Sequence, residues 1–273
     1  MKTMTEAPFL REFIRMGADM YKQGWDERNG GNLSLLLTAE EVAPYTDAAV
    51  LRRMETGFAC PELDGRYVLV TGTGKFFKNI DHTPEEDIGL IRLADGGKTA
   101  ELLWGFSDGG SFTSELAAHL LGHSARLSAD PAQRVMLHCH PPKLIAMTHV
   151  HTMDEREFTR TLWKMCTEAI LAFPEGAATL PWMLCGTNEI GEATAEKLKK
   201  SRLVVWEKHG VYGAGRSLDD AFGTVETAEK AAGIYMDIAG LPHDGGISDD
   251  ALRQLVGRFD LAVRGDYLEE SKL

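Results

Sequence analysis

The chain has 273 residues, of which 44% are hydrophobic and 26% charged, a composition typical of a folded globular protein. Its formal net charge of −12 argues against a nucleic-acid-binding protein, because such a surface repels phosphates over most of its area. No apolar stretch approaches the roughly 20 residues needed to cross a bilayer. The composition therefore predicts neither a nucleic-acid partner nor a membrane partner.

One domain is expected over residues 1–273, because no linker, charge block or shift in composition divides the chain. The N-terminus lacks the apolar core and cleavage site of a secretion signal. Four cysteines are scattered without CxxC pairs, which is typical of a reduced protein without disulfide bonds. We therefore expect a cytoplasmic location.

Apolar spacings of three and four predict helices, and alternating or continuous apolar runs predict strands. In chain order they predict a helix over 5–23, strands over 32–37 and 66–72, a helix over 114–124, a strand over 134–140, helices over 142–150, 155–169 and 188–200, a strand over 203–206 and a helix over 218–239. The segment 46–66 is the least patterned and is expected to be an insertion or long loop. Interleaved strands and helices favour an α/β fold, while periodicity leaves parallel and antiparallel sheets open.

The most informative pattern is a pair of histidines one residue apart, His138 and His140, at the end of the apolar run VMLHCH. On a strand, residues i and i+2 point to the same face about 6.5–7 Å apart, so both imidazoles can reach one metal ion. His209 has a similar context, after the apolar run LVVW and before a glycine. Three histidines with a glutamate within reach are typical of a catalytic zinc site with an open fourth position. Cys139 faces the other way and is expected to pack.

Two further histidine pairs are not expected to bind metal. His149 and His151 follow a predicted helix, on which a two-residue spacing turns the side chains far apart, so we expect surface residues. His119 and His123 are four residues apart on a predicted helix and in principle could share an ion. The glutamate of an HExxH motif is missing there, because Leu120 follows His119. Their expected role is structural, on the rim of the helix.

Glu115 is the main acid/base candidate, because it would lie in the first turn of the helix that opens with TSEL, where the helix dipole favours a carboxylate. Ser114 is the expected N-cap of that helix. From position alone, an ordinary N-terminal helix acid is the better explanation of Glu115. Glu168 is a secondary candidate, because a carboxylate within the apolar segment MCTEAIL is paired, functional or at the edge of a face.

Two glycine-rich turns suggest phosphate binding. RNGGN (28–32) combines glycines with two asparagines, and TGTGK (71–75) follows a predicted strand and ends in a cation. Successive backbone N–H groups in such turns form concavities that bind anions, and the helix start at 113–114 is a third source of donors. Neither turn has the spacing of a Walker A motif, and either alone is usually only a turn.

Several blocks of the sequence, in the same order, resemble the class II aldolase/adducin family. They are WDERNGGNLSLLL, VTGTGKFFKN, TSELAAHLL, MLHCH, PWMLCGTNEIG and HGVYGAG. The resemblance covers most of the chain and leaves mainly residues 46–66 and the C-terminal tail unmatched. It implies a three-layer α/β/α sandwich around a largely antiparallel mixed sheet, assembled as a homotetramer with active sites at subunit interfaces.

The resemblance also implies roles for individual residues. It implies one Zn²⁺ per subunit held by His138, His140 and His209, with Glu115 as the catalytic acid/base. The phosphate-binding residues that it implies are Asn29, Gly31, Asn32, Thr73, Gly74, Thr113 and Ser114. Thr73 stands where the family often has serine, which keeps the hydroxyl, and Lys208 replaces a residue that is usually apolar.

The activity implied by the resemblance is a zinc-dependent, reversible retro-aldol cleavage of L-rhamnulose 1-phosphate in rhamnose catabolism. Alternatives are another sugar-phosphate aldolase of the fuculose-phosphate type, a pentulose-phosphate 4-epimerase, or a non-enzymatic adducin-like interaction domain. Adducin head domains lack the zinc histidines that are present here, which favours an enzyme. A Schiff-base aldolase is disfavoured because no lysine is embedded in an apolar strand.

Overall fold

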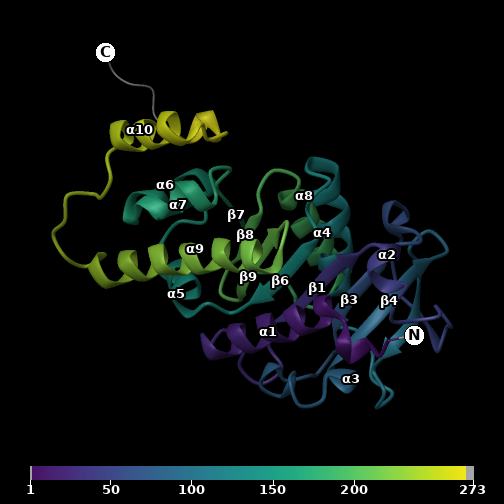
Figure 1. Cartoon of the computed structure of the whole chain (residues 1–273). Helices are drawn as coiled ribbons and strands as arrows, with labels where there is room; N and C mark the ends of the chain where they lie inside the picture. The colour runs from purple at the N-terminus through teal and green to yellow at the C-terminus, as the bar shows by residue number, and fades with distance from the viewer. Residues whose placement is uncertain (1, 269–273) are drawn as a thin grey trace.

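The computed structural model describes residues 2–268, and within this range a sheet of nine strands runs through the molecule (Figure 1). The strands are β1 (Asn32–Leu37), β2 (Arg52–Glu55), β3 (Tyr67–Thr71), β4 (Ile88–Ala94), β5 (Thr99–Gly105), β6 (Val135–Cys139), β7 (Ala177–Leu180), β8 (Leu203–Trp206) and β9 (Gly210–Gly215). Their order across the sheet is β2-β5-β4-β3-β1-β6-β9-β8-β7.

The sheet is mixed but largely antiparallel, which confirms the predicted fold class. Every pairing between neighbouring strands is antiparallel except that of β7 with β8. In the centre of the sheet, β6 pairs with β1 on one side and β9 on the other. His138 is therefore in register with both Asn32 of β1 and Tyr212 of β9, so these three residues form one row across the sheet.

Helices cover both faces of the sheet. They are α1 (Pro8–Lys22), α2 (Ala39–Val42), α3 (Pro84–Asp87), α4 (Leu116–Ala129), α5 (Pro142–Val150), α6 (Glu155–Met165), α7 (Thr167–Ala172), α8 (Asn188–Leu198), α9 (Leu218–Ile238) and α10 (Asp249–Phe259). Helices α1, α5, α6, α7 and α9 share one apolar core with Leu33, Leu35 and Leu37 of β1. Helices α4 and α8 pack on the opposite face, against Met136 and Val204. The result is the expected three-layer arrangement.

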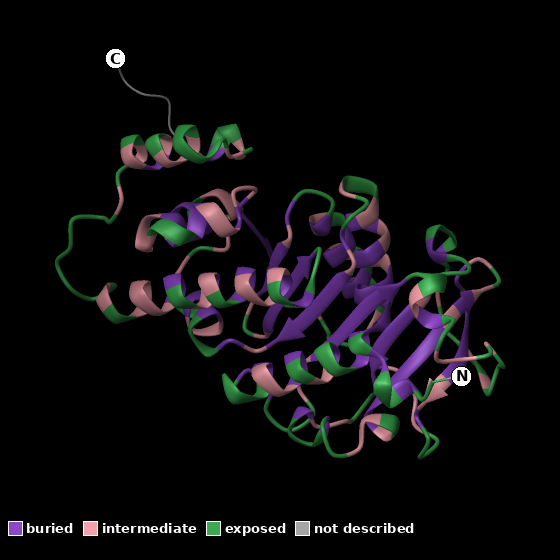
Figure 2. Cartoon of the chain, in the orientation of Figure 1, coloured by how far each residue is buried: buried purple, intermediate pink, exposed green. Residues whose placement is uncertain are grey.

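The central strands are buried on both faces, which explains their nearly continuous apolar sequences (Figure 2). Strand β1 is fully buried over NLSLLL, so its polar residues Asn32 and Ser34 must find partners inside the protein. Residues i and i+2 of a strand share a face, and both of these side chains point toward α4.

Several predicted boundaries differ from the structure. The first helix begins at Pro8, after a short 3-10 turn, because proline suits the first helical position. Helix α4 begins at Leu116 and extends to Ala129, with Glu115 rather than Ser114 at the N-cap position. The predicted helix over 155–169 is two helices, since Cys166 between them is extended. The segment 46–66 is not only a loop, because it contains the edge strand β2.

Candidate metal centre and active-site pocket

Three histidines from two chain segments meet at one end of the central strands. His138 is near the end of β6, His140 follows that strand, and His209 lies in the tight turn between β8 and β9. One ring nitrogen from each lies within 4.8 Å of those of the other two. The ring centroids are 5.0 Å apart for His138 and His140, 5.0 Å for His138 and His209, and 5.3 Å for His140 and His209.

Hydrogen bonds determine which nitrogen of each imidazole is free. The Nδ1–H of His138 donates to the backbone carbonyl of Val211 at 3.0 Å, and the Nδ1–H of His140 donates to the carboxylate of Glu27 at 3.0 Å. The unprotonated Nε2 atoms of these two histidines then face each other at 3.3 Å. Two lone pairs at this distance need a cation between them, so the donor set fits a metal ion.

The environment keeps the imidazoles of His138 and His209 neutral. Burial lowers the pKa of His138 well below its ordinary value, and the neighbouring His140 and His209 lower it further. Burial and His140 lower the pKa of His209 to about 4. Neutral imidazole is the form that binds metal, and a set of three is typical of catalytic zinc sites.

Glu115 lies directly beside the histidines. Its Oε2 atom is 3.5 Å from Nε2 of His138, and it accepts a hydrogen bond from Nδ2 of Asn32 at 3.0 Å. The hydroxyl of Tyr212 is 3.4 Å from the same oxygen. Burial raises the pKa of the Glu115 carboxyl group, and the hydrogen bond from Asn32 partly opposes this. A raised pKa brings a carboxyl group closer to the range in which it can both give and take a proton near neutral pH.

A pocket of about 180 Å³ brings the predicted site residues together. Its lining residues are Asn29, Gly30, Gly31, Asn32, Gly72, Thr73, Gly74, Thr113, Ser114, Glu115, His138, His140, Cys185 and His209. The floor is formed by buried Asn32, Glu115 and His138, while Asn29, Thr73 and Ser114 are exposed at the mouth.

The glycine-rich turn at the pocket needs glycine at Gly31. This residue has a φ of +76°, and a Cβ there would overlap the side chain of the buried Asp26. The turn can therefore approach the three converging histidines closely only without a side chain at this position.

The polar groups at the mouth are neutral donors. The backbone N–H of Thr73 donates to the carbonyl of Ser111, and that of Thr113 donates to the carbonyl of Thr71. Oγ1 of Thr113 also accepts from the backbone N–H of Glu115 at 3.2 Å, so its hydroxyl can serve a ligand only as a donor. Lys75, the cation that ends the TGTGK turn, instead pairs with Asp108 at 2.5 Å and lies 3.7 Å from Asp87. It does not line the pocket.

The other candidates lie elsewhere. Glu168 is exposed in the first turn of α7 and does not line the pocket. His149 is exposed, as expected, and His151 is half-buried and contacts Thr161. His119 and His123 are not on the rim of their helix but fully enclosed beneath the pocket.

Sequence reasoning missed several residues of the pocket region. Tyr212 and His119 are within one or two hydrogen bonds of Glu115, and Cys185 lines the pocket from the PWMLCG segment. Tyr212 of β9 is paired directly with His138 of β6, and side chains of such a pair lie on the same face of the sheet. Knowledge of this strand pairing would have identified Tyr212. Cys185 carried no such signal.

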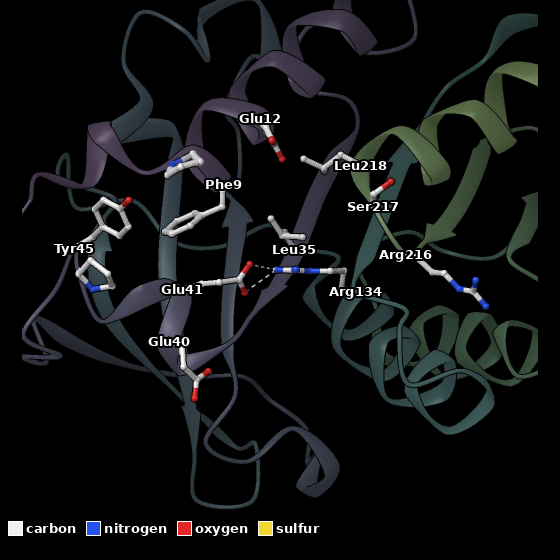
Figure 3. A pocket seen from close by; sticks show the side chains of 12 residues that line it. Phe9, Glu12, Leu35, Glu40, Glu41, Tyr45, Arg134, Arg216, Ser217 and Leu218 are labelled. Carbon is white, nitrogen blue, oxygen red and sulfur yellow. Dashed lines mark hydrogen bonds and ion pairs between the residues drawn. The ribbon is translucent and has the colours of Figure 1, made fainter.

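A larger hollow of about 470 Å³ lies between α1 and the start of α9 (Figure 3). Nη2 of Arg134 donates to both carboxylate oxygens of Glu41 across it, each at 2.9 Å. Its charged side chains include Glu12 and Glu40, and it contains none of the three converging histidines. Its size alone therefore does not make it a catalytic site.

Comparisons with known proteins identify the family. The family model described as Class II Aldolase and Adducin N-terminal domain matches residues 11–236, a range that includes the whole pocket. A protein of Listeria monocytogenes serotype 4a named rhamnulose-1-phosphate aldolase is 49% identical over 271 residues, or 98% of each chain. A protein of Yersinia pseudotuberculosis with the same name is 41% identical over 276 residues, covering 98% of this chain and 100% of its own.

A solved structure also matches. The crystal structure of a sugar-phosphate aldolase from Thermotoga maritima has a TM-score of 0.75 and 28% sequence identity, and the match covers 87% of this chain and 98% of that one. Within residues 2–268, no helix combines the length and apolar character needed to span a bilayer.

Proposed function

The chain belongs to the class II aldolase and adducin family, and on this basis we propose that it catalyses the reversible cleavage of L-rhamnulose 1-phosphate to dihydroxyacetone phosphate and L-lactaldehyde. It is a lyase. Relatives named for this reaction are 41% to 49% identical over nearly the full length of the chain. The observation that carries the proposal is one pocket in which three converging histidines, a buried glutamate and two polar glycine-rich turns meet.

We assign the three-histidine site to one zinc ion per chain, held by His138, His140 and His209. Three neutral nitrogen ligands suit Zn²⁺ and leave its double positive charge uncompensated. When bound, Zn²⁺ supplies Lewis-acid stabilisation of the negative charge that develops on the carbonyl and neighbouring hydroxyl oxygens of the sugar.

Glu115 is assigned the proton transfer. When the bond between C3 and C4 breaks, the C4 hydroxyl loses its proton and becomes the aldehyde group of L-lactaldehyde. The other fragment is an enediolate, which must gain a proton at C3 to become dihydroxyacetone phosphate. The carboxyl group of Glu115 lies next to His138, one of the residues assigned to the zinc ion, and its raised pKa favours donation. In the direction of synthesis the carboxylate removes the same proton. Glu168 is exposed and lies outside the pocket, so we assign it no part in this proton transfer.

The part of the pocket formed by the two glycine-rich turns and the start of α4 is assigned to the phosphate group. Asn29, Gly31 and Asn32 come from the first glycine-rich turn, and Thr73 and Gly74 from the second. Thr113 and Ser114 precede α4. Binding energy from the phosphate, remote from the reacting carbons, orients the sugar for the reaction at its other end.

We further propose that one domain over residues 1–273 forms a homotetramer in the cytoplasm. Trp182 and Leu184 are each 63% exposed, and they immediately precede Cys185 at the pocket. Large exposed apolar side chains beside a pocket are typical of an interface. The mass in solution, measured by light scattering after size-exclusion chromatography, tests the assembly.

The function is tested by cleavage of L-rhamnulose 1-phosphate before and after removal of metal with a chelator, followed by addition of zinc. We expect loss and recovery of activity. Activity that survives verified metal removal would contradict the mechanism. L-fuculose 1-phosphate and a pentulose 5-phosphate assayed beside it distinguish the sister reactions, because faster turnover of either by fully metallated protein would replace the proposed substrate.

A further inference from the structure

A buried chain of hydrogen bonds connects Glu115 to the interior of the protein. Nδ2 of Asn32 is 3.0 Å from Oε2 of Glu115, and Oδ1 of Asn32 is 2.5 Å from Nε2 of His119. Nδ1 of His119 is 2.7 Å from Oγ of Ser34, which is also 2.8 Å from Nε2 of His123. All five residues are at least nine-tenths buried.

Two periodicities produce this chain. Asn32 and Ser34 are two residues apart on β1, so both point to the face covered by α4. His119 and His123 are four residues apart on α4, so both point to the sheet. The rise of about 6 Å over four helical residues is close to the roughly 6.5 Å over two strand residues, which lets the two pairs interdigitate.

The direction of every hydrogen bond follows from the amide of Asn32. Its Nδ2 faces Glu115 and its Oδ1 faces His119, and an amide oxygen can only accept. His119 must then donate through Nε2–H, which leaves its Nδ1 as an acceptor for the Ser34 hydroxyl. The Ser34 oxygen in turn accepts from Nε2–H of His123. Burial lowers the pKa of His119 to about 3, in agreement with a neutral ring.

The end of the chain is consistent with this assignment. In the direction derived above, Nδ1 of His123 carries no proton, and it is a buried atom for which the structure shows no hydrogen-bond partner. An unpaired acceptor on a neutral ring is less costly than a buried N–H without a partner would be.

We propose that His119, Ser34 and His123 are positioning residues that fix the orientation of the Asn32 amide and, through it, the carboxylate of Glu115. The proposal rests on the acid/base role given to Glu115 under the proposed function. Asn32 makes the shortest contact with the Glu115 carboxylate, since Tyr212 and His138 lie at 3.4 and 3.5 Å. If the Asn32 amide rotated by half a turn, its oxygen would face the carboxylate and repel it.

The test compares two substitutions of one residue. His119→Gln keeps an N–H donor near the position of Nε2, whereas His119→Leu fills a similar volume without a donor. For zinc-loaded protein, the readout is the rate at which the C3 proton of dihydroxyacetone phosphate exchanges with deuterated water, which isolates the proton transfer. We expect His119→Leu to lose roughly ten- to a hundredfold in kcat, as a misplaced catalytic group does, with KM changed by less than about threefold. His119→Gln should retain most of the rate.

A merely structural role predicts a different result. Both variants would then lower the melting temperature, and their kcat values would be equal. Equal kcat values in two folded variants would overturn the positioning role while leaving the proposed function intact. If wild-type protein that is fully loaded with zinc exchanges no proton, both the positioning role and the proposed function are contradicted. His82→Leu, a substitution at an exposed histidine, controls for the loss of an imidazole as such.

A second measurement does not depend on activity, and its decisive result comes from the wild-type protein. In protein labelled with ¹⁵N at histidine, two-bond couplings between ring protons and nitrogens distinguish the two neutral tautomers. We expect both His119 and His123 in the Nε2–H form, and Ser34→Ala should alter the signals of both rings. An Nδ1–H form of His119 would reverse the amide of Asn32 and overturn the proposal.

Discussion

Oε2 of Glu115 lies 3.5 Å from Nε2 of His138, so the buried carboxylate borders the nitrogen that we assign to the metal. His138 is fixed by strand pairing with β1 and β9, whereas Glu115 sits at the N-cap position of α4. The sheet therefore positions His138 and the helix positions Glu115. The distance between these two side chains depends on how α4 packs against β1.

The first prediction concerns Glu115. Glu115→Ala should lower kcat by about 10² to 10⁴, which is the usual contribution of general acid–base catalysis, while the bound zinc per chain stays unchanged. Steady-state kinetics and metal analysis on the same sample check this. Normal turnover in the variant would contradict the proton-transfer role, and loss of zinc would mean that the carboxylate serves the metal instead.

A second prediction concerns Glu27, whose carboxylate accepts the hydrogen bond from Nδ1 of His140. Such a partner orients a metal ligand and increases its basicity, and losing it typically costs 10- to 100-fold in metal affinity. We expect Glu27→Ala to weaken zinc binding by that factor, measured by competition with a chromophoric chelator. Glu40→Ala, at an exposed glutamate away from the site, should leave the affinity unchanged.

A third prediction concerns stability against pH. Burial lowers the pKa of His119 to about 3, while in the unfolded chain it is about 6.5. Between these values the unfolded chain binds one proton more, so the free energy of unfolding falls as the pH drops below about 6.5, by up to ~1.4 kcal/mol per pH unit. In metal-free protein, His119→Gln should have a shallower fall than wild type between pH 6 and 4. Parallel curves from denaturant unfolding would contradict this.

The metal site was the part of the molecule most open to prediction from sequence. His138 and His140 share a face because of the two-residue period of a strand, which is a local property. His209 was predicted from its place at the end of another apolar run. By contrast, the burial of His119 and His123 depends on how α4 packs against the sheet. Helical spacing shows that the two side chains share a face of the helix, but it does not show whether that face is covered.

Strand β9 shows why part of the fold was missed. Its sequence GVYGAG is rich in glycine, which is depleted in strands, so no strand was predicted there. The structure explains the glycines by close packing of α9, since a Cβ at Gly213 would come 2.7 Å from Cγ2 of Val225. The need for glycine at this position is set by the packing of α9, which follows in the chain. It could therefore not be predicted from the sequence pattern of the strand itself.

The last prediction concerns the phosphate. Lys75 completes a turn that on sequence grounds suggested a cation for an anionic ligand, but its ammonium group lies between Asp87 and Asp108. Thr73 lies at the mouth of the pocket with its backbone N–H already bonded to Ser111, so only its hydroxyl can serve the ligand. A hydrogen bond to a charged group contributes about 1.5–3 kcal/mol, so Thr73→Val should weaken binding of dihydroxyacetone phosphate at least tenfold.

Lys75→Met is the matched comparison for this prediction. Its effect should appear mainly as lower stability, because it leaves two carboxylates without their cation, and affinity for dihydroxyacetone phosphate should change by less than about threefold. Isothermal titration of both variants, with a melting curve for each, separates the two effects. The reverse ranking, with the lysine variant losing affinity and the threonine variant keeping it, would mean that Lys75 leaves its carboxylates when the phosphate binds.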